Sequence, residues 1–162
     1  MARSEQLQIR VTPTEKARLK RLAKAAGQAV SAYVLARALP SEEPRLAAVL
    51  RALRGDREPR FALAELNDVL GGLAPIEFTA VVRGVDVSGL SPLFQNYVAA
   101  MVELAAAQKR AEPPAWVRDV APLDRPHFGA PLKRLRPHLL RAAPIAFKRR
   151  NIFVDASVGD RV

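Results

Sequence analysis

The chain has no cysteine and only two histidines, and both shortages narrow the chemistry available to it. Without cysteine there is no disulfide and no thiolate nucleophile or ligand. His127 and His138 each lie beside a proline in a basic context, and no carboxylates stand nearby at the spacing of zinc ligands. We therefore expect no metal and no cofactor.

Motifs of catalysis are missing as well. The aspartates of the C-terminal third are scattered rather than paired, at Asp119, Asp124, Asp155 and Asp160. The sequence contains no glycine-rich phosphate loop and no nucleophile elbow. Because no group of residues meets the geometric tests for catalysis, we expect no catalytic residue and no enzyme.

Long hydrophobic runs are also absent. No apolar stretch is long enough to span a bilayer, and the N-terminus lacks the hydrophobic core of a signal peptide. The sequence therefore predicts a cytoplasmic protein with no membrane partner.

Acidic residues are few relative to basic ones. The chain has 26 Lys and Arg against 16 Asp and Glu, which gives a formal net charge of +10. Residues 1–40 and 114–162 each carry a net charge of +6, whereas residues 41–113 carry −2. Two basic ends favour a polyanionic partner, with nucleic acid first and an acidic protein surface second.

Alternation of apolar and polar residues begins near the N-terminus, over residues 5–12. One face of the pattern carries Leu7, Ile9 and Val11, and the other carries Gln6, Gln8 and Arg10. This period of two predicts a β-strand. The next thirty residues offer no hairpin partner, so we expect the strand to pair with a second copy of the chain.

Two helices follow this strand. Residues 12–15 (TPTE) form a capping-box pattern with proline at the first helical position, and Gly27 is placed to end the helix. A second helix should run from about Val30 until Pro40 stops it. A unit of about forty residues buries too little apolar surface to be stable alone, so dimerisation is expected.

The stretch LQIRVTPTEKARLKRLAKAAGQAVSAYVLARAL resembles a ribbon-helix-helix domain, a family of dimeric DNA-binding proteins. The resemblance implies that Gln6, Gln8 and Arg10 read bases in the major groove. It also implies that the start of the second helix, at Ala29, Val30 and Ser31, binds phosphate. Alanine at position 29 departs from the capping serine or threonine of many relatives. A solvated strand edge and, for Ser31, an ordinary surface serine are the alternatives.

Residues 41–112 predict a small helical region without chemistry of its own. Apolar residues recur at helical spacing in PRLAAVLRALRGD and in RFALAELNDVLGGL, whereas IEFTAVVRGV is ambiguous between strand and helix. Ser91 and Pro92 should begin the strongest helix of the chain, which Pro113 should end after Glu112.

Residues 113–162 combine seven prolines with many large apolar side chains. Prolines break regular elements, and disordered segments lack such apolar residues. We therefore expect an extended, basic arm that wraps a partner protein, with folding onto its own helical body as the alternative. The expected partner contacts are Trp116, Phe128, Phe147, Lys148, Arg149, Arg150, Ile152 and Phe153.

The FKRRNIFVD stretch holds the most compact cationic cluster of this arm, Lys148 to Arg150. It has three interpretations. The cluster could add phosphate affinity to DNA binding, it could enter an acidic cleft of a protein partner, or it could be a solvated charge run.

The predicted architecture is mainly α with one N-terminal β-strand. It consists of a ribbon-helix-helix dimerisation domain (1–40), a small helical domain (41–112) and an extended proline-rich arm (113–162). This order resembles antitoxins of bacterial toxin–antitoxin pairs, which repress their own operon and neutralise a toxin through a C-terminal region. The stretch from Tyr97 to Val162 is also similar to proteins encoded beside abortive-infection-type nucleotidyltransferase toxins. Both resemblances imply operator DNA and a toxin as partners.

Three alternatives stay open. The stretch RVTPTEKARLKRLAKAAG, with SAYVLARAL after it, also resembles plasmid mobilisation accessory proteins, which help a relaxase at a transfer origin. A plain transcriptional repressor and a structural adaptor that does not bind DNA are the others.

Overall fold

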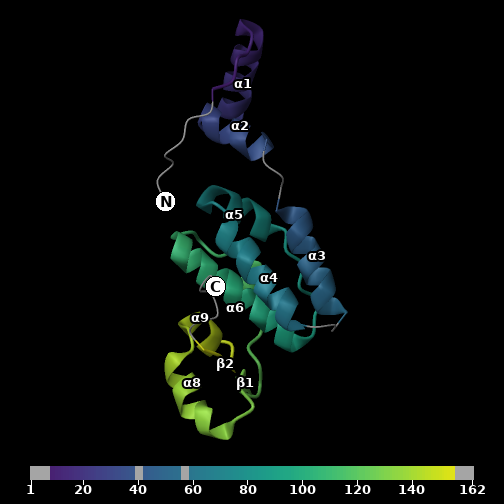
Figure 1. Cartoon of the computed structure of the whole chain (residues 1–162), viewed down its shortest axis with the longest axis vertical. Coiled ribbons are helices and arrows are strands. Elements are labelled where there is room, and N and C mark those ends of the chain that lie inside the picture. The colour runs from purple at the N-terminus through teal and green to yellow at the C-terminus, as the bar shows by residue number, and fades with distance from the viewer. Residues whose placement is uncertain (1–7, 39–41, 56–58, 156–162) are drawn as a thin grey trace. The chain divides into compact units, whose positions relative to one another are not determined.

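A computed structural model describes residues 8–38, 42–55 and 59–155 of the chain. The molecule divides into two compact units, residues 1–41 and residues 42–162, which we call unit 1 and unit 2 (Figure 1). Each unit is described by itself below.

Unit 1 contains the two helices that the sequence predicts. Helix α1 runs from Pro13 to Ala25, and α2 runs from Val30 to Ala38. The strand expected at residues 5–12 is not confirmed: residues 8–12 have no regular secondary structure, and residues 5–7 lie outside the described residues. The expected partner of this strand was a second copy of the chain, and the structure describes one copy.

Unit 2 begins with four helices. These are α3 (Glu43–Arg54), α4 (Pro59–Gly72), α5 (Pro75–Arg83) and α6 (Pro92–Lys109). The ambiguous stretch IEFTAVVRGV forms α5. Pro75 starts the helix, and the Glu77 carboxylate accepts a hydrogen bond from the Ala74 backbone N–H at 3.2 Å. Phe78 and Val82, which are one helical turn apart, are both fully buried. They form the face of α5 that packs against the core.

Helix α6 lies at the centre of unit 2 and contacts α4, α5, α7 and α9 (Figure 1). Its start is capped by the Ser91 hydroxyl, which accepts from the Phe94 N–H at 3.4 Å, and Pro92 occupies the first turn. Most of its length is buried, at Phe94, Asn96, Tyr97, Val98, Ala99, Ala100, Met101, Val102, Ala105 and Ala106. Burial on all sides is what an almost uniformly apolar helix requires.

The C-terminal part of unit 2 is folded rather than extended. It contains short elements in the order α7 (Trp116–Asp119), β1 (His127–Phe128), the 3₁₀ turn η1 (Lys133–Leu135), α8 (Arg136–Ala142), α9 (Ile145–Lys148) and β2 (Ile152–Phe153). Strands β1 and β2 pair in parallel, with His127 opposite Ile152 and Phe128 opposite Phe153.

The expectation of an extended arm over residues 113–162 is therefore wrong for the part described, which ends at Asp155. Two of the seven prolines in this segment begin helices instead of breaking them. Pro137 lies in the first turn of α8, and Pro144 is the N-cap of α9. The apolar residues fill the chain's own core: Phe147 and Ile152 are fully buried, and the Phe147 ring meets the Tyr97 ring of α6 edge-on at 5.8 Å.

Arg150 ties this C-terminal part to α6 and α7. Its Nη2 donates to the Val117 carbonyl at 2.7 Å, and its Nη1 donates to the Val120 carbonyl at 3.3 Å. Nη2 also lies 3.6 Å from the Glu103 carboxylate, and the side chain is 7% exposed. Burial of a charge is costly unless partners surround it, and here carbonyls and a carboxylate supply them.

We expect Arg150→Ala to destabilise the protein by about 3–5 kcal/mol, because it removes the buried donor of the Val117 and Val120 carbonyls and the buried one of the two guanidinium groups at Glu103. Urea unfolding followed by circular dichroism measures this loss. The matched control is Arg149→Ala. Its guanidinium contacts the same carboxylate at 3.0 Å but is 70% exposed, so the cost should stay below about 1 kcal/mol. Equal losses in the two variants would contradict the structural role of Arg150.

Candidate nucleic-acid interface

The start of α1 is fixed by a capping box. The Glu15 N–H donates to the Thr12 hydroxyl at 3.3 Å, and the Thr12 N–H donates to the Glu15 carboxylate at 2.8 Å. Hydrogen bonds from the backbone and hydroxyl of Thr12 lower the pKa of Glu15. This cap sets the point at which residues 8–11 leave the helix, so it positions the segment that holds Arg10.

The turn between α1 and α2 is also specified locally. Gly27 has a φ of +65°, a left-handed conformation that glycine adopts without steric cost. The Gln28 N–H then reaches back to the Ala23 carbonyl at 2.9 Å, which satisfies the end of α1. Two helices are thus joined at a defined angle by four residues, Ala26 to Ala29.

The predicted phosphate-binding residues lie together at the start of α2. Ala29, Val30 and Ser31 are all exposed. The Tyr33 N–H donates to the Ala29 carbonyl at 2.9 Å, so the helical hydrogen bonds begin at Ala29. Alanine offers no side-chain oxygen as a cap, and the amides of a first helical turn have no partners within the helix. Such a turn can accept an anion, and phosphate binding here stays a prediction.

Two of the three predicted base-reading residues are described. Gln8 and Arg10 are exposed, and Gln6 lies outside the described residues. Residues 9–11 border the same hollow as Val30 and Val34 of α2. The structure therefore brings Arg10 to the side of unit 1 on which α2 begins, although it does not test base contacts.

This hollow is lined largely by apolar side chains, among them Ile9, Val11, Leu19, Val30 and Val34. Ile9 is 59% exposed, Val11 43% and Val30 37%. In contrast, unit 1 buries only two hydrophobic side chains among those described, Ala23 and Tyr33. Such apolar surface on so small a unit is what a dimerisation face requires before the second copy is bound.

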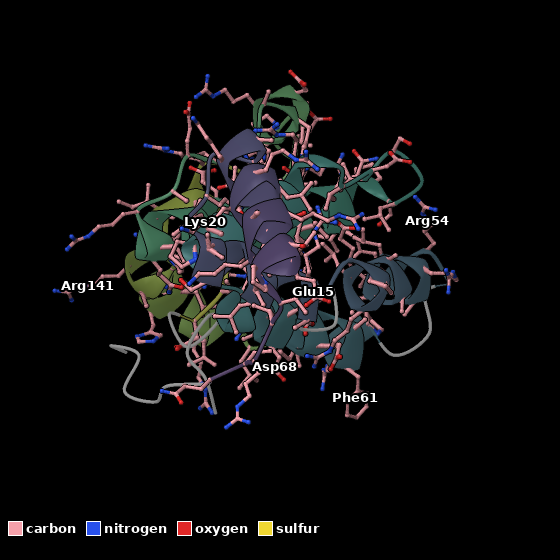
Figure 2. All side chains as sticks on the ribbon, turned by 90° about the horizontal axis from the view of Figure 1, so that it is seen from above. Glu15, Lys20, Arg54, Phe61, Asp68 and Arg141 are labelled. Atoms are coloured by element: carbon pink, nitrogen blue, oxygen red, sulfur yellow. The ribbon has the colours of Figure 1, made fainter. Side chains whose placement is uncertain are left out.

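Cations cover the outer surface of α1. Lys16, Arg18, Lys20, Arg21 and Lys24 are exposed, and none of them is in an ion pair with a described residue. Figure 2 labels Lys20 of α1 in this set. On α2, the Arg37 guanidinium lies 5.0 Å above the Tyr33 ring. Unpaired cations beside a helix start favour a phosphate backbone as ligand.

The predicted partner-binding residues of the C-terminal part fall into two groups. Phe147, Arg150 and Ile152 are buried within unit 2. Trp116 is partly buried, and its indole N–H donates to the Val82 carbonyl at 2.9 Å. These side chains hold the fold together, so a partner could not reach the first three without opening unit 2.

The second group is more accessible. Lys148 is partly buried and donates to the Arg141 carbonyl at 3.0 Å, while Arg149 is exposed beside Glu103. The Phe128 and Phe153 rings stack at 5.1 Å and are partly buried.

The sequence analysis missed three exposed cations in the same C-terminal part, at Lys133, Arg134 and Arg141. The signal was present as a stretch, residues 125–154, without any Asp or Glu.

The described residues hold no group of three or more His, Asp or Glu side chains placed to bind a metal ion. Within the same residues, no helix combines the length and apolarity needed to cross a membrane.

Comparison with protein families returns a match over residues 1–74 to the model described as NikA-like, Mobilization protein NikA. This match covers unit 1, α3 and α4, and it amounts to less than half of the chain. No curated protein and no solved structure matches the chain. The N-terminal part is thus similar to a mobilisation protein family, and the similarity favours that interpretation over the antitoxin one.

We expect Ile9→Asp to weaken dimerisation at least about 100-fold, because a dimer that buries Ile9 would have to bury two carboxylates instead. Sedimentation equilibrium measures the change. Phe61→Asp is the control. Phe61 is 73% exposed on α4 and extends outward in Figure 2, so the same new charge should leave the dimer intact. Equal dimerisation by Ile9→Asp and the native chain would rule out the apolar hollow as the dimer face.

Proposed function

We propose that the chain is a DNA-binding accessory protein of plasmid mobilisation. It binds duplex DNA at a transfer origin as a homodimer and assists a relaxase there. The observation that carries the proposal is the mobilisation-family match over residues 1–74. Unit 1, with its capped helix pair, apolar hollow and exposed cations, lies entirely inside the matched range.

The proposed binding chemistry divides unit 1 into two roles. Gln6, Gln8 and Arg10 read base edges from a two-stranded ribbon that two copies of residues 5–12 form in the major groove. The start of α2 and the cations of α1 hold the phosphate backbone on either side. Support comes from the exposure of Arg10 and from its place beside the start of α2.

The antitoxin interpretation has no finding in its favour. No similarity to a toxin-binding protein was found, and Phe147, Arg150 and Ile152, three of the eight expected toxin contacts, are buried within unit 2. A cytoplasmic, non-catalytic role is part of the proposal and rests on the sequence alone.

Co-purification tests the assisting role. A relaxase encoded beside this chain should be recovered with the tagged protein from cells that carry the transfer origin. Recovery should survive nuclease treatment if the two proteins touch directly. A chain that never associates with a relaxase or with a transfer origin would refute the proposal.

We expect Arg10→Ala to reduce the preference for the native DNA site at least about tenfold while salt-sensitive binding to any duplex remains. Removal of one base contact costs about 1–3 kcal/mol, whereas the phosphate contacts are untouched. Fluorescence anisotropy with the preferred site and with random duplex measures both affinities. Arg18→Ala, an exposed cation of α1, is the control and should weaken binding to both duplexes alike. Equal binding of both duplexes by the native protein would exclude base reading.

A further inference from the structure

Residues 125–154 contain eight Lys and Arg and no Asp or Glu. They form β1, η1, α8, α9 and β2, which we call the basic lobe (Figure 1). A charge imbalance of this size destabilises a compact structure through self-repulsion unless opposite charges lie nearby. The first question is therefore which of the eight cations the fold itself uses.

Three of them have a role inside unit 2. Arg149 and Arg150 contact Glu103 of α6, and Lys148 donates to the Arg141 carbonyl at 3.0 Å. The FKRR cluster that the sequence emphasises is thus largely used by the fold. It is not the free cationic surface of the lobe.

Five cations remain, and the structure exposes all of them: Arg125, Lys133, Arg134, Arg136 and Arg141. Across the part of the chain that the structure describes, none of the five is in an ion pair with a carboxylate. Figure 2 shows Arg141 reaching away from the ribbon. The five residues come from the segment before β1, from η1 and from α8, and β1 and α8 lie at one end of unit 2 in Figure 1.

The lobe that carries these cations is held in place by specific contacts. The Gly129 N–H donates to the Phe153 carbonyl at 2.9 Å, and a β-carbon at Gly129 would come within 2.9 Å of the Val154 side chain. The Asn151 amide donates to the Leu123 carbonyl at 3.0 Å. Arg136, one of the five exposed cations, also has a contact within the lobe: its guanidinium lies 4.8 Å from the Phe128 ring centroid, above the stacked phenylalanines. Cations on a rigid support lose less entropy when they bind an anion.

We propose that the basic lobe is a second DNA contact of this protein, which binds the phosphate backbone of duplex DNA without reading its sequence. The inference rests on the proposed function in one respect, because unit 1 brings the DNA. Once unit 1 is bound, the lobe is tethered near the same duplex, and tethering raises its effective concentration to about the millimolar range. The phosphates of the bound duplex can therefore neutralise the lobe with little further loss of translational and rotational entropy.

An anionic membrane and an acidic protein are the competing partners, because Leu132, Leu140 and Ile145 are also exposed in the lobe. Isolated exposed apolar side chains are common on protein surfaces, and DNA binding does not require them. The experiment distinguishes DNA from the other two partners.

The test variant is Lys133→Gln/Arg134→Gln/Arg141→Gln, which removes three exposed cations and no described ion pair. Each phosphate contact contributes about −0.9 to the slope of log K against log salt concentration. The slope should therefore become less steep by up to about 3 per chain. The ratio of affinities for the preferred site and for random duplex should stay unchanged, because no base contact is lost.

The matched control is Arg51→Gln/Arg60→Gln/Arg83→Gln. It removes the same charge from exposed positions on α3, α4 and α5 and should leave the slope near the native value. An unchanged slope in the lobe variant overturns the proposal, and so does an equal change in both variants. Binding of the native protein to phosphatidylserine vesicles that the lobe variant loses, with the DNA slope unchanged, would assign the lobe to a membrane instead.

Failure of this inference is distinguishable from failure of the proposed function. Random duplex alone reports the lobe contact through the salt slope, whereas site preference and the Arg10→Ala variant report unit 1. A protein without site preference but with a steep, lobe-dependent slope would refute the mobilisation proposal and support the lobe.

Discussion

A unit of about forty residues cannot enclose its own apolar surface, and this constraint governs unit 1. The local sequence signals of unit 1 fix where its helices begin and turn. A capping box begins α1, and Gly27 allows the turn from α1 into α2. What it lacks is an interior, since Ile9, Val11 and Val30 remain accessible to solvent. In the proposed function, dimerisation and DNA recognition are linked, because the segment expected to pair with a second copy also carries Arg10.

Unit 2, in contrast, encloses an apolar core of its own. Helix α6 is buried on nearly every side, so the surrounding helices and the C-terminal part are arranged around it. Among the described residues, Arg150 is the one buried charged side chain, and it is tolerated because carbonyl oxygens and the Glu103 carboxylate lie around it. Lys133, Arg134 and Arg141, earlier in the same basic stretch, lie exposed on the surface without a described carboxylate partner. One run of similar residues thus contains both structural and free cations.

The sequence predicted the local elements well, because their signals are local. Pro13, Gly27, Ser91 and Pro92 mark helix boundaries that the structure confirms. Tertiary packing decided the rest. IEFTAVVRGV is helical because Phe78 and Val82 reach the core together, which its β-branched composition does not reveal.

The prolines of residues 113–155 were misjudged for a similar reason. Proline suits the first turn of a helix and disrupts the middle of one. Which effect it has therefore depends on where the helix begins relative to the proline. Nor could the sequence distinguish Arg149 from Arg150. Adjacent residues of the same type differ in burial because one points toward α6 and α7 and the other toward solvent. The N-terminal strand stays a prediction, since it depends on a second chain.

The fully buried positions of Phe147 and Ile152 have a consequence for biosynthesis. With Val154, these residues are the last in sequence of those in the described interior around α6, so the ribosome must release residues 42–154 before unit 2 can close. Unit 1 precedes unit 2 in the chain, and its two helices begin and turn at local signals. If unit 1 dimerises as proposed, nascent chains on neighbouring ribosomes associate through unit 1 while unit 2 is still being synthesised.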